Sequence, residues 1–266
     1  MRNNTTATAM SDLVEGLKLW RLWSAFAWED IRTTYRRSAI GVLWISISFL
    51  VFVAIKIVIF GPMTGLGNDP YYAQYLLLGL FTWQFINQIV TTAPSVFLAS
   101  ESWIRNDPLP LSVFVYQSIA RSLFDLGLTF AVVVLGFLYF RPSLTPDALL
   151  FIPAMALVLL NALWVKVFLG VICTRFRDLG HLIQTAMRVM FFLTPIFWLP
   201  SQLGESVMKW LWWNPFSHFL WITRSPVIDG DPVIESWVFV GIITIVGCSA
   251  AMTVFAIFRR RLVFWL

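Results

Sequence analysis

Long, nearly uncharged hydrophobic segments follow one another along most of this chain. A helix that spans a membrane needs about 20 apolar residues, and six segments meet that need. Their bounds are 40–60, 71–93, 111–140, 148–173, 179–199 and 237–258. Charged residues make up only 12% of the 266 residues, about half the share found in soluble domains. The sequence therefore predicts an all-α integral membrane protein with six transmembrane helices.

Two further stretches are patterned without being long enough to span. Within residues 12–35, Leu13, Leu17 and Trp20 recur at three- and four-residue steps, with basic residues between them. This spacing predicts an N-terminal amphipathic helix that lies in the membrane interface, the alternative being a soluble helix packed on a partner. Residues 200–236 hold two short apolar pieces, which favour short re-entrant or interfacial helices outside the cytoplasm. A single transmembrane domain over residues 1–266 leaves no room for a separate soluble enzyme domain.

The basic residues are shared unevenly between the two ends of these spans. With the N-terminus inside, twelve Lys and Arg residues fall on the cytoplasmic side, and only Arg141, Lys209 and Arg224 fall on the other. Cytoplasmic segments of membrane proteins are rich in Lys and Arg, so we expect both termini in the cytoplasm. The start of the chain lacks the pattern of a cleaved signal peptide. The net charge of +5 indicates topology signals and contacts with anionic lipids, not nucleic acid.

Motifs of soluble enzyme chemistry are missing from the sequence. It has no phosphate-binding loop, no Gly-rich dinucleotide loop, no zinc-protease motif and no serine-hydrolase elbow. His181 and His218 have no second ligand at metal spacing, and Cys173 and Cys248 lie within apolar runs. We therefore expect no metal or cofactor on this chain, and any energy source must lie in another subunit.

Five charged side chains fall within the predicted spans. Lys56 and Lys166 lie near span ends and are expected to extend to the membrane surface. Arg121 and Asp125 are four residues apart, which predicts a structural ion pair, with a proton relay as the alternative. Arg188 lies near the middle of its span without an acid in the same helix. It is either hydrogen-bonded inside the bundle or faces a path for an anionic substrate, where it would meet a phosphate-bearing lipid carrier.

Aromatic residues are unusually frequent, with 14 Trp, 24 Phe and 6 Tyr. Flat aromatic faces suit a path along which an uncharged, hydroxyl-covered chain slides. Packing against lipid and interfacial belts are the alternative for most of these rings. Together with Arg188, the candidate residues that line such a path are Trp44, Phe191, Phe192, Phe197 and Trp198.

Three segments in order resemble one transporter family. They are residues 35–44 (YRRSAIGVLW), residues 177–196 (RDLGHLIQTAMRVMFFLTPI) and residues 214–224, where Asn214-Pro215 precedes Arg224. The chain resembles the permease subunit of type-2 ABC exporters of the polysaccharide group, which handle O-antigen, capsule and teichoic-acid polymers. The resemblance covers most of the chain, from about Asp30 to the last span. The cytoplasmic segment after the second span departs from the family pattern because it has no lysine.

This resemblance implies a homodimer in the bacterial cytoplasmic membrane that exports a lipid-linked polysaccharide along an aromatic path at the dimer seam. Two copies of a separate ABC subunit would bind ATP and Mg²⁺ and hydrolyse the ATP. The segment after the second span would transmit this energy. Its candidate coupling residues are Glu101, Trp103, Ile104, Arg105 and Asn106.

Three other functions stay open at this point. One is an ABC exporter of drugs or lipids. Another is an intramembrane glycosyl or lipid transferase, with Asp107, Asp178 or the Arg121/Asp125 pair as its acid. Against the transferase, only Asp125 among the 14 carboxylates lies inside a span, whereas transferases commonly present clustered acids. The last is an assembly subunit that does not transport.

Overall fold

The computed structural model describes residues 2–64, 69–200 and 205–266, and in these ranges it contains helices and no strand. Short 3-10 helices cover 93–95, 98–100 and 146–150. The α-helices are α1 (Arg2–Lys18), α2 (Trp20–Tyr35), α3 (Leu43–Met63), α4 (Pro70–Thr92), α5 (Glu101–Asn106), α6 (Ser112–Phe140), α7 (Phe151–Arg175), α8 (Asp178–Leu193), α9 (Glu205–Trp213), α10 (Pro215–Ile228) and α11 (Ile234–Trp265).

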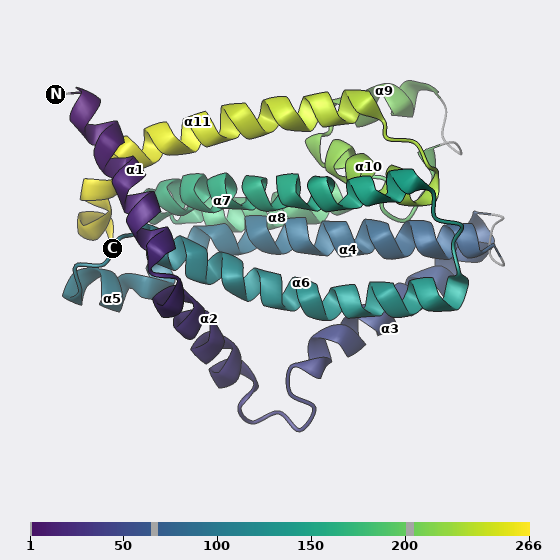
Figure 1. Ribbon diagram of the computed structural model, residues 1–266, viewed down its shortest axis with the longest axis horizontal. Helices are drawn as coiled ribbons and strands as arrows, with labels where there is room; N and C mark the ends of the chain where they lie inside the picture. The colour runs from purple at the N-terminus through teal and green to yellow at the C-terminus, as the bar shows by residue number, and fades with distance from the viewer. Residues whose placement is uncertain (1, 65–68, 201–204) are drawn as a thin grey trace.

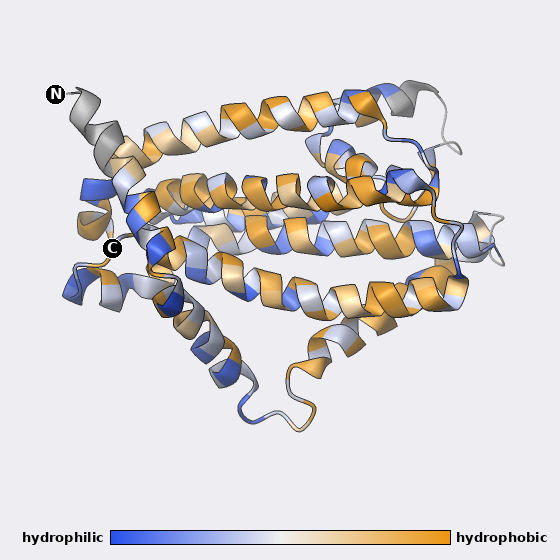
Figure 2. Cartoon of the chain, viewed as in Figure 1, coloured by the Kyte–Doolittle hydropathy of each residue, from blue (hydrophilic) through white to orange (hydrophobic). Residues whose placement is uncertain are grey.

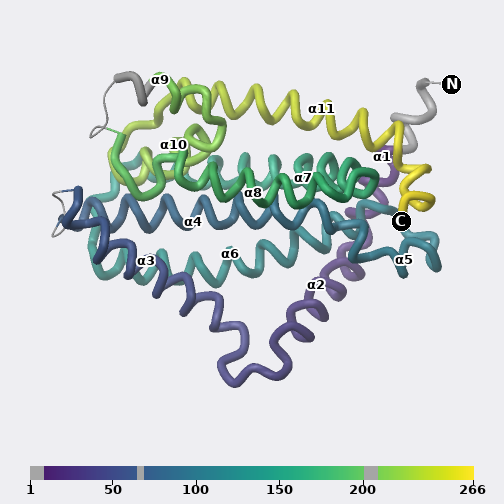
Figure 3. The backbone as a smooth tube through the Cα atoms, turned by 180° about the vertical axis from the view of Figure 1, so that it is seen from behind, coloured from purple at the N-terminus to yellow at the C-terminus, as the bar shows by residue number. Residues whose placement is uncertain are grey.

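Helix α4 runs along the centre of a bundle formed with α6, α7, α8 and α11 (Figures 1 and 3). It has no charged residue and is apolar or weakly polar all round, as expected of a helix surrounded by others. In its most apolar stretch 67% of the residues are buried, against 11% in α3. Hydrophobic residues dominate the middle of the bundle, and hydrophilic ones gather at its two ends (Figure 2). The protein is an all-α membrane protein.

Five helices are long and apolar enough to cross a membrane in the described part of the chain, within 43–63, 70–95, 112–140, 146–175 and 234–265. The remaining predicted span, 179–199, coincides with α8, which has 16 residues and ends at Leu193. It ends there because Pro195 disfavours helical backbone at the residue before it, and Thr194 is extended, with φ −99° and ψ 139°. The prediction of a helix to residue 199 was wrong, and residues 194–200 form the loop after α8.

The predicted interfacial helix 12–35 is divided into α1 and α2 at Leu19. The division lets α1 pack on both α6 and α11 while α2 runs along α6. Asp12 fastens α1, because its carboxylate accepts from the backbone N–H groups of Leu111 (3.3 Å) and Ser112 (3.0 Å) at the start of α6. The same carboxylate lies 3.6 Å from Arg259 near the end of α11. Both ends of the chain and α5 therefore lie at the same end of the bundle (Figure 1).

The stretch 200–236, predicted to hold short helices, contains α9 and α10 in its described part. Helix α10 begins at Asn214-Pro215, where the Asn214 side chain accepts from the Phe216 N–H at 3.0 Å and Pro215 has no N–H to satisfy. All residues from 217 to 227 are buried, and α10 packs against α4, α7 and α11. This helix is therefore part of the bundle and does not lie on a surface.

Candidate functional site

Tyrosines of α4 hold the loop after α8. A broken helix leaves carbonyl groups that lipid cannot satisfy, so partners must come from the protein. The Tyr72 hydroxyl donates to the Phe197 carbonyl at 2.7 Å. The Tyr75 hydroxyl lies 3.1 Å from the carbonyl oxygens of both Pro195 and Trp198. These hydroxyls replace the helical hydrogen bonds that end at Leu193.

Two residues of the 214–224 motif hold the same loop from the side of α10. Arg224 is 2% exposed, and its Nη1 donates to the Pro195 carbonyl at 2.9 Å. Its guanidinium lies 3.5 Å from the centroid of the Tyr75 ring. The Asn214 amide donates to the Thr194 hydroxyl at 3.0 Å. Two of the segments that resemble the transporter family, 177–196 and 214–224, therefore contact each other at this loop.

The loop brings Phe197 into an aromatic cage, which we define as Phe52, Phe60, Phe191 and Phe197. The ring centroid of Phe197 lies 5.0 Å from that of Phe60 and 5.5 Å from that of Phe191. The Lys56 ammonium lies 5.0–5.2 Å from the centroids of all four rings, which are cation–π distances. Phe52 and Phe60 lie one turn to either side of Lys56, so the ammonium stays at the depth of its own turn. The prediction that Lys56 extends to the membrane surface was wrong.

A groove of about 420 Å³ lies beside the cage, between α3, α4 and α8. Its lining combines apolar and aromatic residues with polar groups: Phe52, Leu80, Trp83, Gln84, Asn87, Met187, Arg188, Phe191 and Phe192. Arg188 is exposed, and Gln84 and Asn87 are half-buried. Among the residues that the structure describes, these three side chains have no hydrogen-bond or ion-pair partner. The groove therefore presents one cation and two amides that are free to bind something else.

Most of the predicted path residues come together here. Arg188, Phe191 and Phe192 line the groove, Phe197 belongs to the cage, and the Trp198 indole donates to the Phe192 carbonyl at 3.1 Å. Trp44 is apart from them, 54% exposed near the start of α3. Sequence reasoning missed Gln84 and Asn87. Two amides three residues apart on one face of an uncharged span were the signal that could have found them.

The predicted ion pair between Arg121 and Asp125 is not formed in the described part of the chain. Asp125 instead accepts from the Gln88 amide of α4 at 2.5 Å, and Arg121 donates to the Thr34 hydroxyl of α2 at 3.2 Å. Both residues line a polar pocket of about 380 Å³. Helix spacing brought the two side chains to one face, but partners on neighbouring helices bind them instead.

Lys166 also differs from its prediction. It is fully buried, and its ammonium donates to the hydroxyls of Thr92 and Ser118, each at 2.7 Å. A lysine that extended to the membrane surface would expose its Nζ. Lys166 instead joins α7 to α6 and to the last residue of α4, where the chain turns toward α5.

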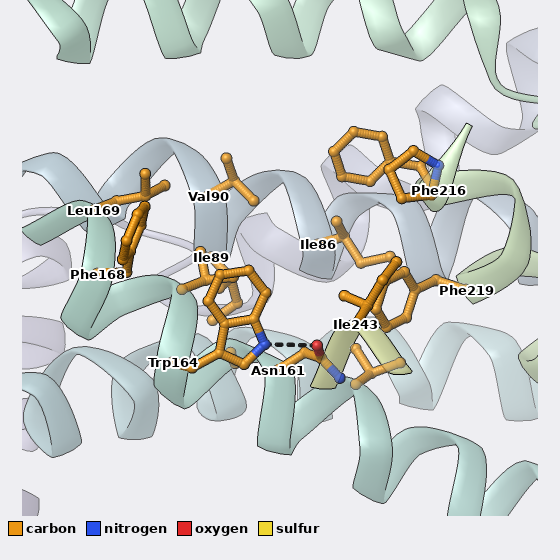
Figure 4. Close-up of a pocket in the computed structure, with 14 residues that line it drawn as sticks. Ile86, Ile89, Val90, Asn161, Trp164, Phe168, Leu169, Phe216, Phe219 and Ile243 are labelled. Carbon is orange, nitrogen blue, oxygen red and sulfur yellow. Dashed lines mark hydrogen bonds between the residues drawn. The ribbon is translucent and has the colours of Figure 1, made fainter. Parts of the chain in front are cut away.

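A third cavity, of about 380 Å³, lies between α4, α7, α10 and α11 (Figure 4). Apart from Asn161 and Trp164 its lining is apolar, and these two bind each other through an indole N–H to amide oxygen bond of 2.6 Å (Figure 4). The Asn161 amide also donates to the Thr244 hydroxyl at 2.7 Å. This cavity suits hydrocarbon, because its polar side chains are already satisfied.

Both nitrogens of the buried His218 ring are hydrogen-bonded. Nε2 donates to the Trp212 carbonyl at 3.0 Å, and Nδ1 therefore accepts from the Ser236 hydroxyl, also at 3.0 Å. Burial lowers the pKa of His218 below its usual 6.5, and the bond to the Trp212 carbonyl opposes this in part. His218 is thus a neutral structural residue.

Residues 21–227 match a family described as ABC-2 type transporter. The chain belongs to the ABC-2 type transporter family. This match covers most of the spans, the segment 101–106 that holds the predicted coupling residues, the groove and the loop after α8. Permeases of this family generally work with an ATP-binding subunit.

Relatives of this ABC-2 permease include two proteins of Klebsiella pneumoniae named O-antigen export system permease protein RfbA. One is 25% identical over 239 residues, which cover 87% of this chain and 88% of the relative. The other is 25% identical over 226 residues, covering 83% and 87%. A protein of the same name from Myxococcus xanthus is 23% identical over 177 residues, covering 66% and 67%.

The predicted coupling residues of this ABC-2 permease all lie on the short helix α5. Ile104 is buried and anchors the helix. Trp103 is 48% exposed, and its ring centroid lies 5.0 Å from that of Phe26 on α2. Glu101 and Arg105 form an ion pair of 3.0 Å with both side chains largely exposed. Helix α5 lies outside the bundle (Figure 1), and its exposed residues are polar or aromatic.

Proposed function

We propose that this chain is the permease of an ATP-driven exporter that moves a lipid-linked, O-antigen-like polysaccharide across the bacterial cytoplasmic membrane. The groove between α3, α4 and α8 is the observation that carries the proposal. It combines ring faces with free amides and one cation, and one of its walls is α3, whose apolar stretch is only 11% buried. Ring faces can pack on sugar rings, while amides can bind sugar hydroxyls. The printed names of the relatives support the same class of cargo.

In this proposal two copies of the chain form the transport path, with Trp44 near their seam. Helix α3 supports this arrangement, because 11% of its apolar stretch is buried within one chain and its exposed face needs lipid or a second copy to cover it. In this arrangement the path forms only when two copies associate.

Two copies of a separate ATP-binding subunit, with ATP and Mg²⁺, would contact the end of the bundle that carries α5 and both chain ends. The basic residues of this end support a cytoplasmic location. They include Arg105, Arg175, Arg177 and the run 259–261. Movement of the partner subunits would reach the spans through α5 and through α2, which contacts Trp103.

Deletion and complementation test the proposed function. A strain that lacks this gene is expected to lose the polysaccharide from its surface and to accumulate it inside, and the wild-type gene is expected to restore export. Extraction in mild detergent is expected to recover a stoichiometric ATP-hydrolysing partner. Unchanged surface polysaccharide in the deletion strain would show that the cargo is a different one, and recovery of the chain without any ATPase would refute the exporter.

A further inference from the structure

We propose that Lys56 and Arg188 form one binding site for the phosphate-bearing head of the lipid-linked cargo, an inference that rests on the proposed function. The two cations border the same two rings. Arg188 lines the groove together with Phe52 and Phe191, and the Lys56 ammonium lies 5.2 Å from the centroids of both rings. Arg188 and Phe191 are three residues apart on α8, a rise of about 4.5 Å along the helix.

Both cations lie well away from the ends of their helices. Lys56 is seven residues before Met63, the last residue of α3, which corresponds to about 10 Å. Arg188 is ten residues after Asp178, the first residue of α8, which corresponds to about 15 Å. Unpaired charge at such depth is costly, and where it occurs it commonly marks a path for substrate or ions.

The chain supplies no counter-charge to these cations in its described part. The Lys56 ammonium lies at cation–π distance from four rings, and among the described residues neither Lys56 nor Arg188 has a hydrogen-bond or ion-pair partner. Asp125 is the one acidic residue in the interior of a spanning helix, and it is bound by Gln88 in the polar pocket beside α2. A second copy brings the same set of residues. The balancing anion therefore has to come from a ligand.

The chemistry of the site favours a phosphate group. The planar fork of Arg188 can bind two phosphate oxygens at once, and Lys56 supplies a second, point-like cation. Two cations suit a group with two negative charges, such as a diphosphate. The free amides of Gln84 and Asn87 can bind further oxygens or the hydroxyls of the first sugar. The cage rings hold the lysine in place and leave an apolar surface for the lipid tail.

Binding of farnesyl diphosphate, with farnesol as the uncharged probe, tests this site on the purified permease with its ATP-binding partner in lipid nanodiscs. The wild-type protein is expected to bind farnesyl diphosphate at least tenfold more tightly than farnesol. Lys56→Met and Arg188→Met are each expected to weaken diphosphate binding about tenfold and to leave farnesol binding unchanged, since each removes a charge-assisted bond. Lys56→Arg is expected to keep most of the affinity. Lys209→Met removes an exposed cation of α9 and is the matched control.

Three results would overturn the inference. The first is equal binding of the two probes by the wild-type protein, and the second is unchanged diphosphate binding by both methionine variants. The third is dissociation of the dimer in these variants, measured by light scattering, which would assign the cations to contacts with the second copy. These results are independent of the deletion experiment. If the deletion strain loses its surface polysaccharide but the wild-type protein binds both probes equally, the proposed phosphate site is refuted and the proposed exporter function is not. Both methionine variants remove charge from the membrane, so impaired insertion is not expected.

Discussion

The contact between Gly247 of α11 and Trp164 of α7 allows a sharp test of the packing. A Cβ atom at residue 247 would lie 2.3 Å from Cε2 and 2.6 Å from Cδ2 of the indole, closer than any real contact. The ring is not free to move aside, because its N–H donates to the Asn161 amide oxygen at 2.6 Å. Asn161 is in turn fixed by its bond to Thr244 on α11. Substitution of the glycine therefore forces the two helices apart or breaks this chain of hydrogen bonds.

The expected cost for Gly247→Ala follows from two contributions. Overpacking a filled interface costs about 1–3 kcal/mol, and loss of the indole hydrogen bond costs about 1 kcal/mol. We expect the free energy of unfolding to fall by about 2–4 kcal/mol. The matched control is Gly241→Ala on the same helix, where a Cβ would have no neighbour within 4 Å. It is expected to be neutral or to stabilise by about 0.5–1 kcal/mol, because alanine favours a helix more than glycine does.

Unfolding of the purified variants in one detergent, titrated with SDS and followed by circular dichroism, measures these differences. A third variant, Trp164→Leu, removes the ring. In this background Gly247→Ala is expected to lower the free energy of unfolding by less than about 0.5 kcal/mol, because residues in contact have coupled effects on stability. Equal losses for the two glycine variants, or no loss for Gly247→Ala, would refute the reasoning. The reasoning would also be refuted if Gly247→Ala lowered the free energy of unfolding as much in the Trp164→Leu background as in the wild-type protein.

Three further predictions concern other parts of the molecule. Arg105→Glu on α5 is expected to lower export at least tenfold while the thermal midpoint stays within about 2 °C, because its exposed ion pair contributes little to stability; export by cells and melting of the purified protein measure this. His218 is expected to make the protein less stable as the pH falls below 6.5. Its folded-state pKa is lowered, so the unfolded state binds more protons in that range, and unfolding at pH 7.5 and 5.5 measures the loss. Tyr75→Phe is expected to cost about 1 kcal/mol in SDS titration, with Arg224 still bound to the loop after α8.

Each of these has a matched control and an outcome that would contradict it. Lys209→Glu reverses an exposed charge away from α5 and is expected to export normally, so equal loss in both reversal variants would argue against coupling at α5. His218→Gln is expected to remove most of the difference in stability between pH 7.5 and 5.5. If the difference is unchanged, groups other than His218 cause it. Tyr139→Phe removes a hydroxyl from a residue that is 81% exposed, and a cost equal to that of Tyr75→Phe would contradict the role of the loop bonds.

Five of the six predicted spans coincide with long apolar helices, because length and hydrophobicity are legible in the sequence. The central place of α4 also follows, since it has no charge on any face. The end of α8 was missed for a different reason. Hydropathy stays high through Leu199, so the predicted span was extended to that residue. Pro195, which ends the helix, was given too little weight. Backbone geometry carried the information there, and composition did not.

The contacts of intramembrane charges were harder to predict. Helix spacing places Arg121 near Asp125, but it says nothing of Thr34 and Gln88, which come from other helices and bind them instead. For Lys56, the sequence gives the distance to the end of the span. Two of the four rings that surround its ammonium, Phe191 and Phe197, come from α8 and the loop after it, more than 130 residues later. Such contacts depend on how helices pack, which one-dimensional patterns do not encode.

The Asp12 carboxylate sets an order of events during synthesis. Its partners at the start of α6 come about a hundred residues later in the chain, and Arg259 comes close to the last residue. At about 5–20 residues per second, roughly 12–50 s pass between the emergence of Asp12 and that of Arg259. The first helix to leave the ribosome therefore cannot acquire its full set of contacts until the end of α11 has been made.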